Sequence, residues 1–221
     1  TKFLLQHGAR NFRAKCDQMS PLMWAAEKGR SDLIDIIAPY CTMEEQIEAK
    51  ELLASMLIAS GSNYQNLQRG LDTLSNTLDL RAMHDVPKRL IVSRIPIFHD
   101  RSECQTREQL EHRRSNHYDS WWIEGLLIRE RLLGPLNRKY RYSLRYQGAV
   151  LLDNHDYIRG IELLLHVIEL CQIHAIDIVQ QHIRDLISIL CEMQSMEMAL
   201  PIEAVQRLLT IIINEISKDT I

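Results

Sequence analysis

The scarcity of glycine and proline constrains the fold of this chain more than any other feature of its sequence. The 221 residues include 8 glycines and 6 prolines. An all-β fold needs many tight turns, and such turns depend on these two residues more than on most others. Apolar residues also recur with the period of a helix, most clearly in the stripe formed by Leu67, Leu71, Leu74 and Leu78. The sequence therefore predicts an all-α fold with long helices.

Residues 1–41 resemble the end of an array of ankyrin repeats. Ser20 can cap a helix that begins at Pro21, because proline loses no hydrogen bond at the first helical position. Gly29 separates this helix from a second apolar stretch, Leu33 to Ile37. The order is similar to the ankyrin pattern T-P-L-H-x-A, with Ser20 in the place of threonine. Since stacking needs about three repeats, we expect these residues to be the last repeat or repeats of a longer array. An unrelated helical hairpin is the alternative.

Residues 42–221 are predicted to form tetratricopeptide-like helical hairpins, which gives a helical-repeat solenoid overall. Thr42-Met43-Glu44-Glu45 has the form of a capping box at the start of the first helix. The turn of its hairpin is predicted at Gly61-Ser62-Asn63. The clearest repeat pairs Tyr142 to Leu152 with Tyr157 to Leu170, and it has glycines where the two helices of such a repeat approach each other.

The rest of this region contains one long connection and further helices. Val86 to Gln105 has no helical period and is predicted to be an ordered connection. Thr106-Arg107-Glu108-Gln109 is a second capping box. A helix from Trp121 should stop at Gly134-Pro135. Two final helices are predicted at about Ile173 to Met193 and Pro201 to Ile216.

The sequence lacks the common signatures of catalysis. It contains no glycine-rich phosphate loop, no G-x-S-x-G and no H-E-x-x-H. The spacing of its histidines is poor for a metal, since His112 and His117 are five apart and His174 and His182 eight apart. The formal net charge of -3 speaks against a general nucleic-acid binder. No apolar run reaches the roughly 18 residues of a membrane span. We expect no enzyme activity, cofactor, metal, nucleic acid or membrane.

The five cysteines point to a reducing compartment. They are odd in number and include no C-x-x-C pair, which predicts buried free thiols rather than disulfides. They are Cys16, Cys41, Cys104, Cys171 and Cys191. No signal-peptide pattern opens the chain, and it lacks an initiator methionine. We therefore expect an excised piece of a longer cytoplasmic, and possibly also nuclear, protein.

Two groups of charged residues invite a functional interpretation. Glu124, Arg129, Glu130 and Arg131 look like an acid–base cluster, but we expect a solvated helix face with weak ion pairs. A second group could catch an acidic peptide, although plain surface charge is the favoured interpretation. It consists of Arg107, Arg113 and Arg114.

Trp121-Trp122 is the most unusual aromatic feature of the chain. Adjacent residues of a helix point about 100° apart, so one ring can join the core while the other covers a neighbouring helix. An exposed tryptophan would instead be an anchor for a partner. Packing is favoured.

Four stretches resemble motifs of the Fem (feminization) family. They are EAKELLASM (48–56), RSECQTREQLEHRR (101–114), IEGLLIRERLLG (123–134) and YQGAVLLDNHDYIRGIELLLHVIEL (146–170). The resemblance extends over nearly the whole chain and is most specific in 101–170. Residues 84–100 and Trp121-Trp122 depart from it.

This resemblance implies a role in ubiquitination. Fem proteins are substrate receptors of cullin-2 RING ubiquitin ligases, in which an N-terminal ankyrin array binds C-terminal degrons and a later box docks elongin B/C and cullin-2. Both parts are expected outside this chain, so no degron or docking residue is assigned within it. The alternative is a stand-alone tetratricopeptide adaptor for chaperone tails, although Arg141 and Arg145 lack the accompanying lysine and asparagine set.

Overall fold

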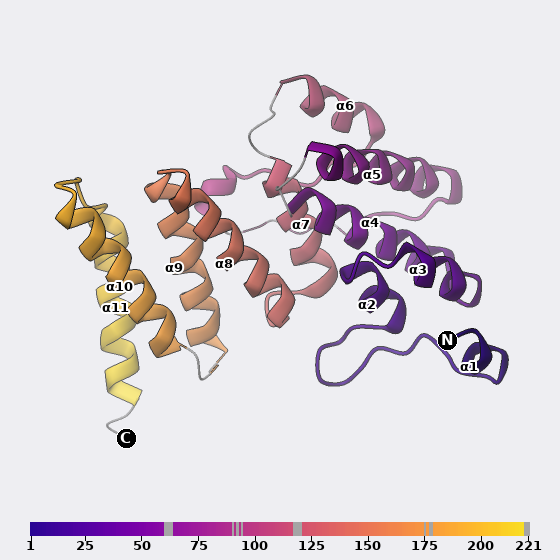
Figure 1. Ribbon diagram of the computed structural model, residues 1–221, viewed down its shortest axis with the longest axis horizontal. Coiled ribbons are helices and arrows are strands. Elements are labelled where there is room, and N and C mark those ends of the chain that lie inside the picture. Colours follow the sequence, from indigo (N-terminus) through magenta and orange to yellow (C-terminus); the bar gives the residue numbers. More distant parts are fainter. Residues whose placement is uncertain are drawn as a thin grey trace. The chain divides into compact units, whose positions relative to one another are not determined.

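The computed structural model describes residues 1–59, 64–89, 91, 93, 95–116, 121–174, 176 and 179–218. Within those residues it consists of helices and irregular connections, without a β-strand (Figure 1). This confirms the predicted all-α, helical-repeat solenoid class. The chain divides into two compact units, the first of Thr1–Ser93 with Asp100–Tyr140 and the second of Arg94–His99 with Arg141–Ile221.

The first unit contains the ankyrin-like pair and the hairpins that follow it. Its helices are α1 (Lys2–Gln6), α2 (Pro21–Glu27), α3 (Ser31–Ile37), η1 (Ala38–Tyr40), α4 (Met43–Ala59), α5 (Tyr64–His84), α6 (Arg107–Asn116) and α7 (Trp121–Leu133). The Ser20 hydroxyl accepts a hydrogen bond from the Met23 amide at 3.2 Å, and Pro21 is the first residue of α2. Gly29 has a φ of +64° between α2 and α3, a conformation that favours glycine. The predicted start and break of this helix pair are confirmed.

Helix α4 is the centre of the first unit. It packs against α2, α5 and α7, and its Leu52 is fully buried. Helix α5 approaches closely at Gly70, because a Cβ there would stand 3.0 Å from the carbonyl oxygen of Ala54. The division into an ankyrin part, residues 1–41, and a tetratricopeptide-like part, residues 42–221, stays a prediction about repeat type. The packing places α2 and α4 in one core.

The two capping boxes differ in completeness. At the start of α4, the Thr42 amide donates to Glu45 Oε2 at 2.8 Å and the Glu45 amide donates to Thr42 Oγ1 at 3.2 Å. At the start of α6, the Gln109 amide donates to Thr106 Oγ1 at 3.3 Å, but Gln109 Oε1 accepts from the Gln105 amide instead. The first capping box is therefore confirmed. For the second box, only the hydrogen bond from the Gln109 amide to the Thr106 side chain is confirmed. Helix α7 ends at Leu133, as predicted.

The second unit holds the clearest repeat. Its helices are η2 (Pro96–Phe98), α8 (Arg138–Asp153), α9 (Tyr157–Ile173), α10 (Val179–Ser195) and α11 (Ile202–Lys218). The first three residues of α8 belong to the first unit. A Cβ on Gly160 would stand 2.8 Å from Leu152 Cγ and 3.0 Å from the carbonyl oxygen of Gly148. The two glycines thus let α8 and α9 cross closely, which confirms the predicted helix pair. Helices α10 and α11 both pack against α9.

The last two predicted helices are present, but the boundary between α9 and α10 was misplaced. Helix α9 continues through Ile173, where the prediction started the next helix, and α10 begins at Val179. The reason is that Val167 and Cys171 are both buried, so the apolar face of α9 continues to its end. The predicted turn at Gly61-Ser62-Asn63 lies outside the described residues.

The cysteines are free thiols, as predicted, but they are not all buried. Cys104 and Cys171 are in the interior, and Cys41 is half-buried. Cys16 and Cys191 are exposed, because Cys16 lies in the loop before α2 and Cys191 on the outer side of α10. The expectation of burial was wrong for these two.

Candidate protein-binding groove

The charged cluster on α7 is buried, so the expectation of a solvated face was wrong. Glu124 and Arg129 are 2% and 3% exposed, and the Arg131 side chain is also inside the unit. Helix α7 packs against α4 on one side. On another side it contacts the connection that leads from α5 to α6, since Glu124 binds the Cys104 amide. Its charges therefore face protein rather than water.

Five charged side chains from four segments form one buried ion-pair network. Glu51 of α4 pairs with Arg81 of α5 (Nε–Oε1 2.7 Å) and with Arg131 of α7 (Nη2–Oε2 2.8 Å). Arg131 also pairs with Glu103 (Nε–Oε1 2.7 Å), and Lys88 Nζ lies 3.2 Å from Glu103 Oε2. Breaking a buried pair by removing one partner strands the other charge, which is strongly destabilising. The network therefore ties these segments together.

The electrostatics of the network centre on Glu51. Burial alone would raise the pKa of this carboxyl, because it disfavours the charged form. The hydrogen bonds from Arg81 and the charges of Arg131 and Lys88 outweigh burial and lower the pKa of Glu51 to about 2. Burial alone would lower the pKa of Arg131, but the carboxylates of Glu103 and Glu51 outweigh burial and raise it. Both groups are thus held in their charged forms at neutral pH.

The network explains how an irregular connection can be ordered. The Arg81 Nη1 donates hydrogen bonds to the carbonyl oxygens of Val86 (3.2 Å) and Pro87 (3.1 Å). Lys88 Nζ donates to the carbonyl oxygen of Cys104 at 2.7 Å. Buried backbone groups need such partners where no helix supplies them. These contacts hold both ends of the predicted connection, at Val86 to Lys88 and at Cys104, while its order between them stays a prediction.

Glu124 fastens the end of this connection to α7. Its Oε1 accepts a hydrogen bond from the Cys104 amide at 2.8 Å, and its Oε2 lies 2.5 Å from Arg113 Nη1. Burial raises the pKa of Glu124, while Arg113 opposes the rise. Arg113 is partly exposed, but its partner Glu124 is buried, so Arg113 is more than a plain surface charge. Arg107 and Arg114 pair with partly exposed aspartates, as expected for surface charges.

Trp121 is a core residue. Its side chain is 5% exposed and belongs to the apolar core of the first unit, whereas Trp122 is half-buried. The packing interpretation is confirmed for Trp121.

The second unit contains a groove that lies wholly within it. It has a volume of about 390 Å³ and runs between α8 and α10, with α9 beneath it. Val167 of α9 is buried in its floor, and Leu152, Leu164 and Ile189 are half-buried along it. An apolar floor between two helix walls is typical of a binding site for an apolar group.

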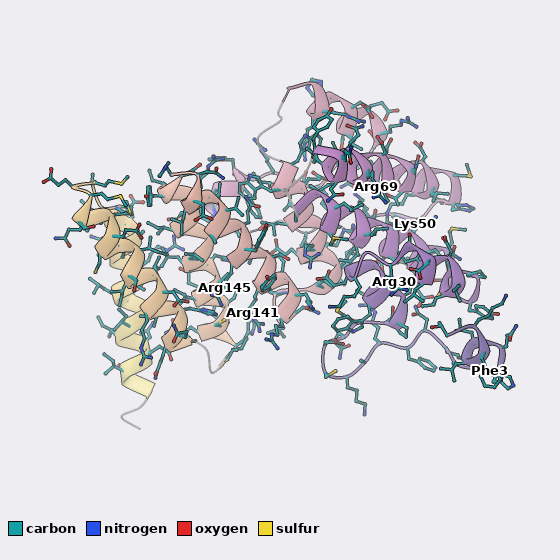
Figure 2. All side chains as sticks on the ribbon, viewed as in Figure 1. Phe3, Arg30, Lys50, Arg69, Arg141 and Arg145 are labelled. Atoms are coloured by element: carbon teal, nitrogen blue, oxygen red, sulfur yellow. The ribbon has the colours of Figure 1, made fainter. Side chains whose placement is uncertain are left out.

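Charged side chains gather at one end of the groove. Arg145 Nη2 of α8 lies 3.5 Å from Asp185 Oδ2 of α10, and His182 Nδ1 lies 4.0 Å from the same oxygen. Figure 2 labels Arg145 together with Arg141, which lies one turn earlier on α8. Burial lowers the pKa of His182, Arg145 and Arg141 lower it further, and Asp185 opposes them. His182 is therefore neutral at pH 7 beside two permanent cations.

In the described part of the chain, no group of three or more His, Cys, Asp or Glu side chains has an arrangement that could hold a metal ion. His117 lies outside the described residues. Burial lowers the pKa of His166 to about 4. Across the same described ranges, no helix combines the length and apolar character needed to cross a membrane.

Comparison with known proteins shows which proteins this chain is similar to. No profile of a known protein family matches the chain. It is 28% identical to protein fem-1 homolog C of Xenopus laevis over 163 residues and 29% identical to fem-1 homolog C of Danio rerio over 158 residues. Protein fem-1 homolog CG6966 of Drosophila melanogaster is 26% identical over 156 residues. The chain thus resembles Fem-1 homologs from a frog, a fish and a fly. The alignments cover 70% of this chain and 23–25% of these relatives, so the chain spans about a quarter of their length.

The similarity to Fem-1 homologs confirms the resemblance found in the motifs. Sequence reasoning nevertheless missed both the network and the groove. One signal for the network was present, since Glu51 falls on the apolar face of α4 that also carries Ile47, Ala54 and Ile58. A single charge in an apolar stripe indicates a buried partner. The groove left no comparable signal, because the alignment of α8 with α10 determines its shape.

Proposed function

We propose that the intact protein is a non-catalytic substrate receptor of a cullin-2 RING ubiquitin ligase that recognises C-terminal degrons. This chain is its protein-interaction scaffold segment, in the cytoplasm, with the nucleus as a second compartment. Elongin B/C and cullin-2 bind through regions outside this chain. The observation that carries the proposal is the Fem-family relationship, with its most specific motifs in residues 101–170.

The packing of the first unit supports a scaffold role. The ankyrin-like helix α2 packs directly on α4, and the buried network joins α4 to α5, α7 and the connection between α5 and α6. Because these contacts are in the interior, the ankyrin-like end cannot turn freely on the hairpins. We therefore propose that the first unit fixes the direction in which upstream ankyrin repeats present a bound substrate.

Affinity purification of the intact protein from cells tests the proposal. We expect elongin B, elongin C and cullin-2 to co-purify in stoichiometric amounts. The 221-residue chain, expressed with the same tag, is the matched control and should recover none of them. An intact protein that folds but recovers no elongin or cullin-2 would refute the ligase assignment.

The alternative, an adaptor for chaperone tails, has less support. Sites of that type clamp a terminal carboxylate with lysine and asparagine, and the residues that line the groove between α8 and α10 include neither. Arg141 and Arg145 are the two arginines that such a clamp could use, and Arg141 is buried. Micromolar binding of an acidic peptide with a free C-terminus, together with no elongin binding by the intact protein, would restore this alternative.

A further inference from the structure

Another groove lies in the first unit, where the end of α5 meets the start of α6. It has a volume of about 460 Å³, and the two helices that border it pack against each other (Figure 1). Part of its lining is apolar and accessible, since Ala82 and Pro87 are exposed and Val86 is half-buried. An apolar stem of a ligand that covers these side chains removes apolar surface from water, which is favourable. We call this site the α5–α6 groove.

Two buried cations line the α5–α6 groove, but their hydrogen bonds are directed to the interior. Arg81 donates two hydrogen bonds to Glu51 and two more to backbone carbonyl oxygens of the connection. Lys88 Nζ donates to another carbonyl oxygen and lies 3.2 Å from Glu103 Oε2. The two side chains are 6% and 1% exposed. An anion in the groove would therefore gain little from these cations.

The first turn of α6 is occupied as well. The Gln109 amide donates to the Thr106 hydroxyl and the Leu110 amide to the Thr106 carbonyl oxygen. Hydrogen bonds of the Glu108 carboxylate with the Thr106 side chain and with its own amide lower the pKa of Glu108. The amides that attract an anion to a helix N-terminus are thus already engaged. This end of the groove does not favour an anion either.

Two carboxylates at the rim of the groove lack a cationic partner. Asp79 is compensated, because its Oδ2 lies 2.7 Å from Arg107 Nη1. Among the described residues, Asp85 and Glu108 form no ion pair. The buried network has three cations and two carboxylates, so the network and these two rim carboxylates together carry one net negative charge. Helix α5 also ends here, at His84, and the C-terminus of a helix attracts cations. The groove therefore favours a cation.

The shape of the groove favours a side chain over a metal ion. In the described part of the chain, no group of three carboxylate, histidine or cysteine side chains could hold a metal. Lysine and arginine combine a cationic head with an aliphatic stem, and such stems pack well along apolar surface. The groove offers an apolar wall and a negative rim in one place.

We propose that the α5–α6 groove is a docking site for an internal segment of a protein partner that inserts a lysine or arginine side chain. The stem lies along Ala82, Val86 and Pro87, and the head pairs with the rim carboxylates Asp85 and Glu108. A terminal carboxylate of a ligand does not fit, because it would meet the same negative rim. The site does not depend on the assembly of the intact protein with cullin-2.

A randomised library of 12-residue peptides, displayed with both ends blocked by flanking sequence, tests the proposal. The library is selected on the 221-residue chain and depleted on its Ala82→Trp variant, in which the added ring fills the groove while every charge is kept. Ala82 is exposed on α5, so the variant should keep the circular dichroism and melting temperature of the wild type. We expect the enriched peptides to share a lysine or arginine.

Removal of the rim charges identifies the anchor. For the best enriched peptide, fluorescence anisotropy should show binding weakened about tenfold or more by Asp85→Asn combined with Glu108→Gln, as expected for the loss of charge-assisted hydrogen bonds. Asparagine tolerates the φ of +51° at position 85. Replacing the basic residue of the peptide with norleucine should have a similar effect, and both changes together should weaken binding no more than either alone.

The matched control combines Asp35→Asn with Glu44→Gln. It removes the same two kinds of charge from exposed positions of the first unit outside the groove lining, on α3 and in the first turn of α4, and should change affinity less than threefold. The proposal is wrong if the selection enriches no sequence or enriches acidic or uncharged peptides. Retention of the enriched peptides by Ala82→Trp, equal effects of the two double variants, or binding that requires a free C-terminus would also overturn it.

Discussion

Replacing Glu51 with glutamine should destabilise the first unit strongly and in a pH-dependent way. Glutamine has the shape of the protonated carboxyl, so the substitution removes the charge and leaves Arg81, Lys88 and Arg131 with Glu103 alone. The pKa of Glu51 falls from 4.5 to about 2 on folding. At about 1.36 kcal/mol for each pKa unit, this difference corresponds to roughly 3 kcal/mol of stability at pH 7.

The sign of the pH dependence follows from the lowered pKa. A carboxyl whose pKa is lower in the folded state stabilises the fold above its unfolded pKa, and the contribution is lost as the pH falls through the folded pKa. For Glu51 the contribution is therefore nearly complete above about pH 5, falls to less than about half at pH 3 and nearly vanishes below about pH 2. The difference between the wild type and Glu51→Gln should shrink in the same way.

Tryptophan fluorescence is a suitable assay, because all three tryptophans, Trp24, Trp121 and Trp122, lie in the first unit. Urea unfolding followed by this signal reports that unit without interference from the second. The control Glu111→Gln removes an exposed partner, 3.6 Å from Arg114, and should cost less than about 1 kcal/mol. A loss for Glu51→Gln below about 1 kcal/mol at pH 7, or a loss that is the same at pH 3, would refute the reasoning.

Three further substitutions test the packing. Leu52→Asp places a charge in the core around α4, and urea unfolding should show a loss of more than about 4 kcal/mol of stability. In an intact protein that still folds stably, this substitution should impair ubiquitination but leave degron binding unchanged. Normal ubiquitination would contradict a fixed ankyrin junction. Gly160→Ala forces a methyl group to within 2.8 Å of Leu152 and should cost about 1–3 kcal/mol of stability. Circular dichroism should show that the second unit melts at a lower temperature, and an unchanged melting temperature would disprove the close crossing. Ser20→Ala removes a helix cap and should cost about 1 kcal/mol, whereas Ser20→Thr should cost much less by the same fluorescence assay.

Local signals in the sequence predicted local structure well. The cap at Ser20 and the capping box at Thr42 each depend on residues within three positions, so their geometry can be read directly from the chain. The glycines at 148 and 160 were also informative, because their spacing matches one known type of helix crossing.

Long-range electrostatics could not be read in the same way. Arg131 pairs with Glu103, 28 positions away, and with Glu51, 80 positions away. Taken alone, α7 has the composition of a helix with a charged outer face. Its charges are buried only because α4 and a connection without helical period meet there. The groove likewise depends on how far α10 is offset along α8, which neither helix encodes by itself.

The separation of the network partners along the chain has a consequence during synthesis. Glu51 leaves the ribosome 80 residues before Arg131 does. Until then α4 and α5 can form their hairpin, but Glu51 lacks one of its two arginines and Glu103 has not found its place. The nascent first unit should therefore stay open to solvent around Glu51, and it should close cooperatively once α7 has emerged. A chain that is truncated before Arg131 would present that unfinished interior to chaperones and proteases.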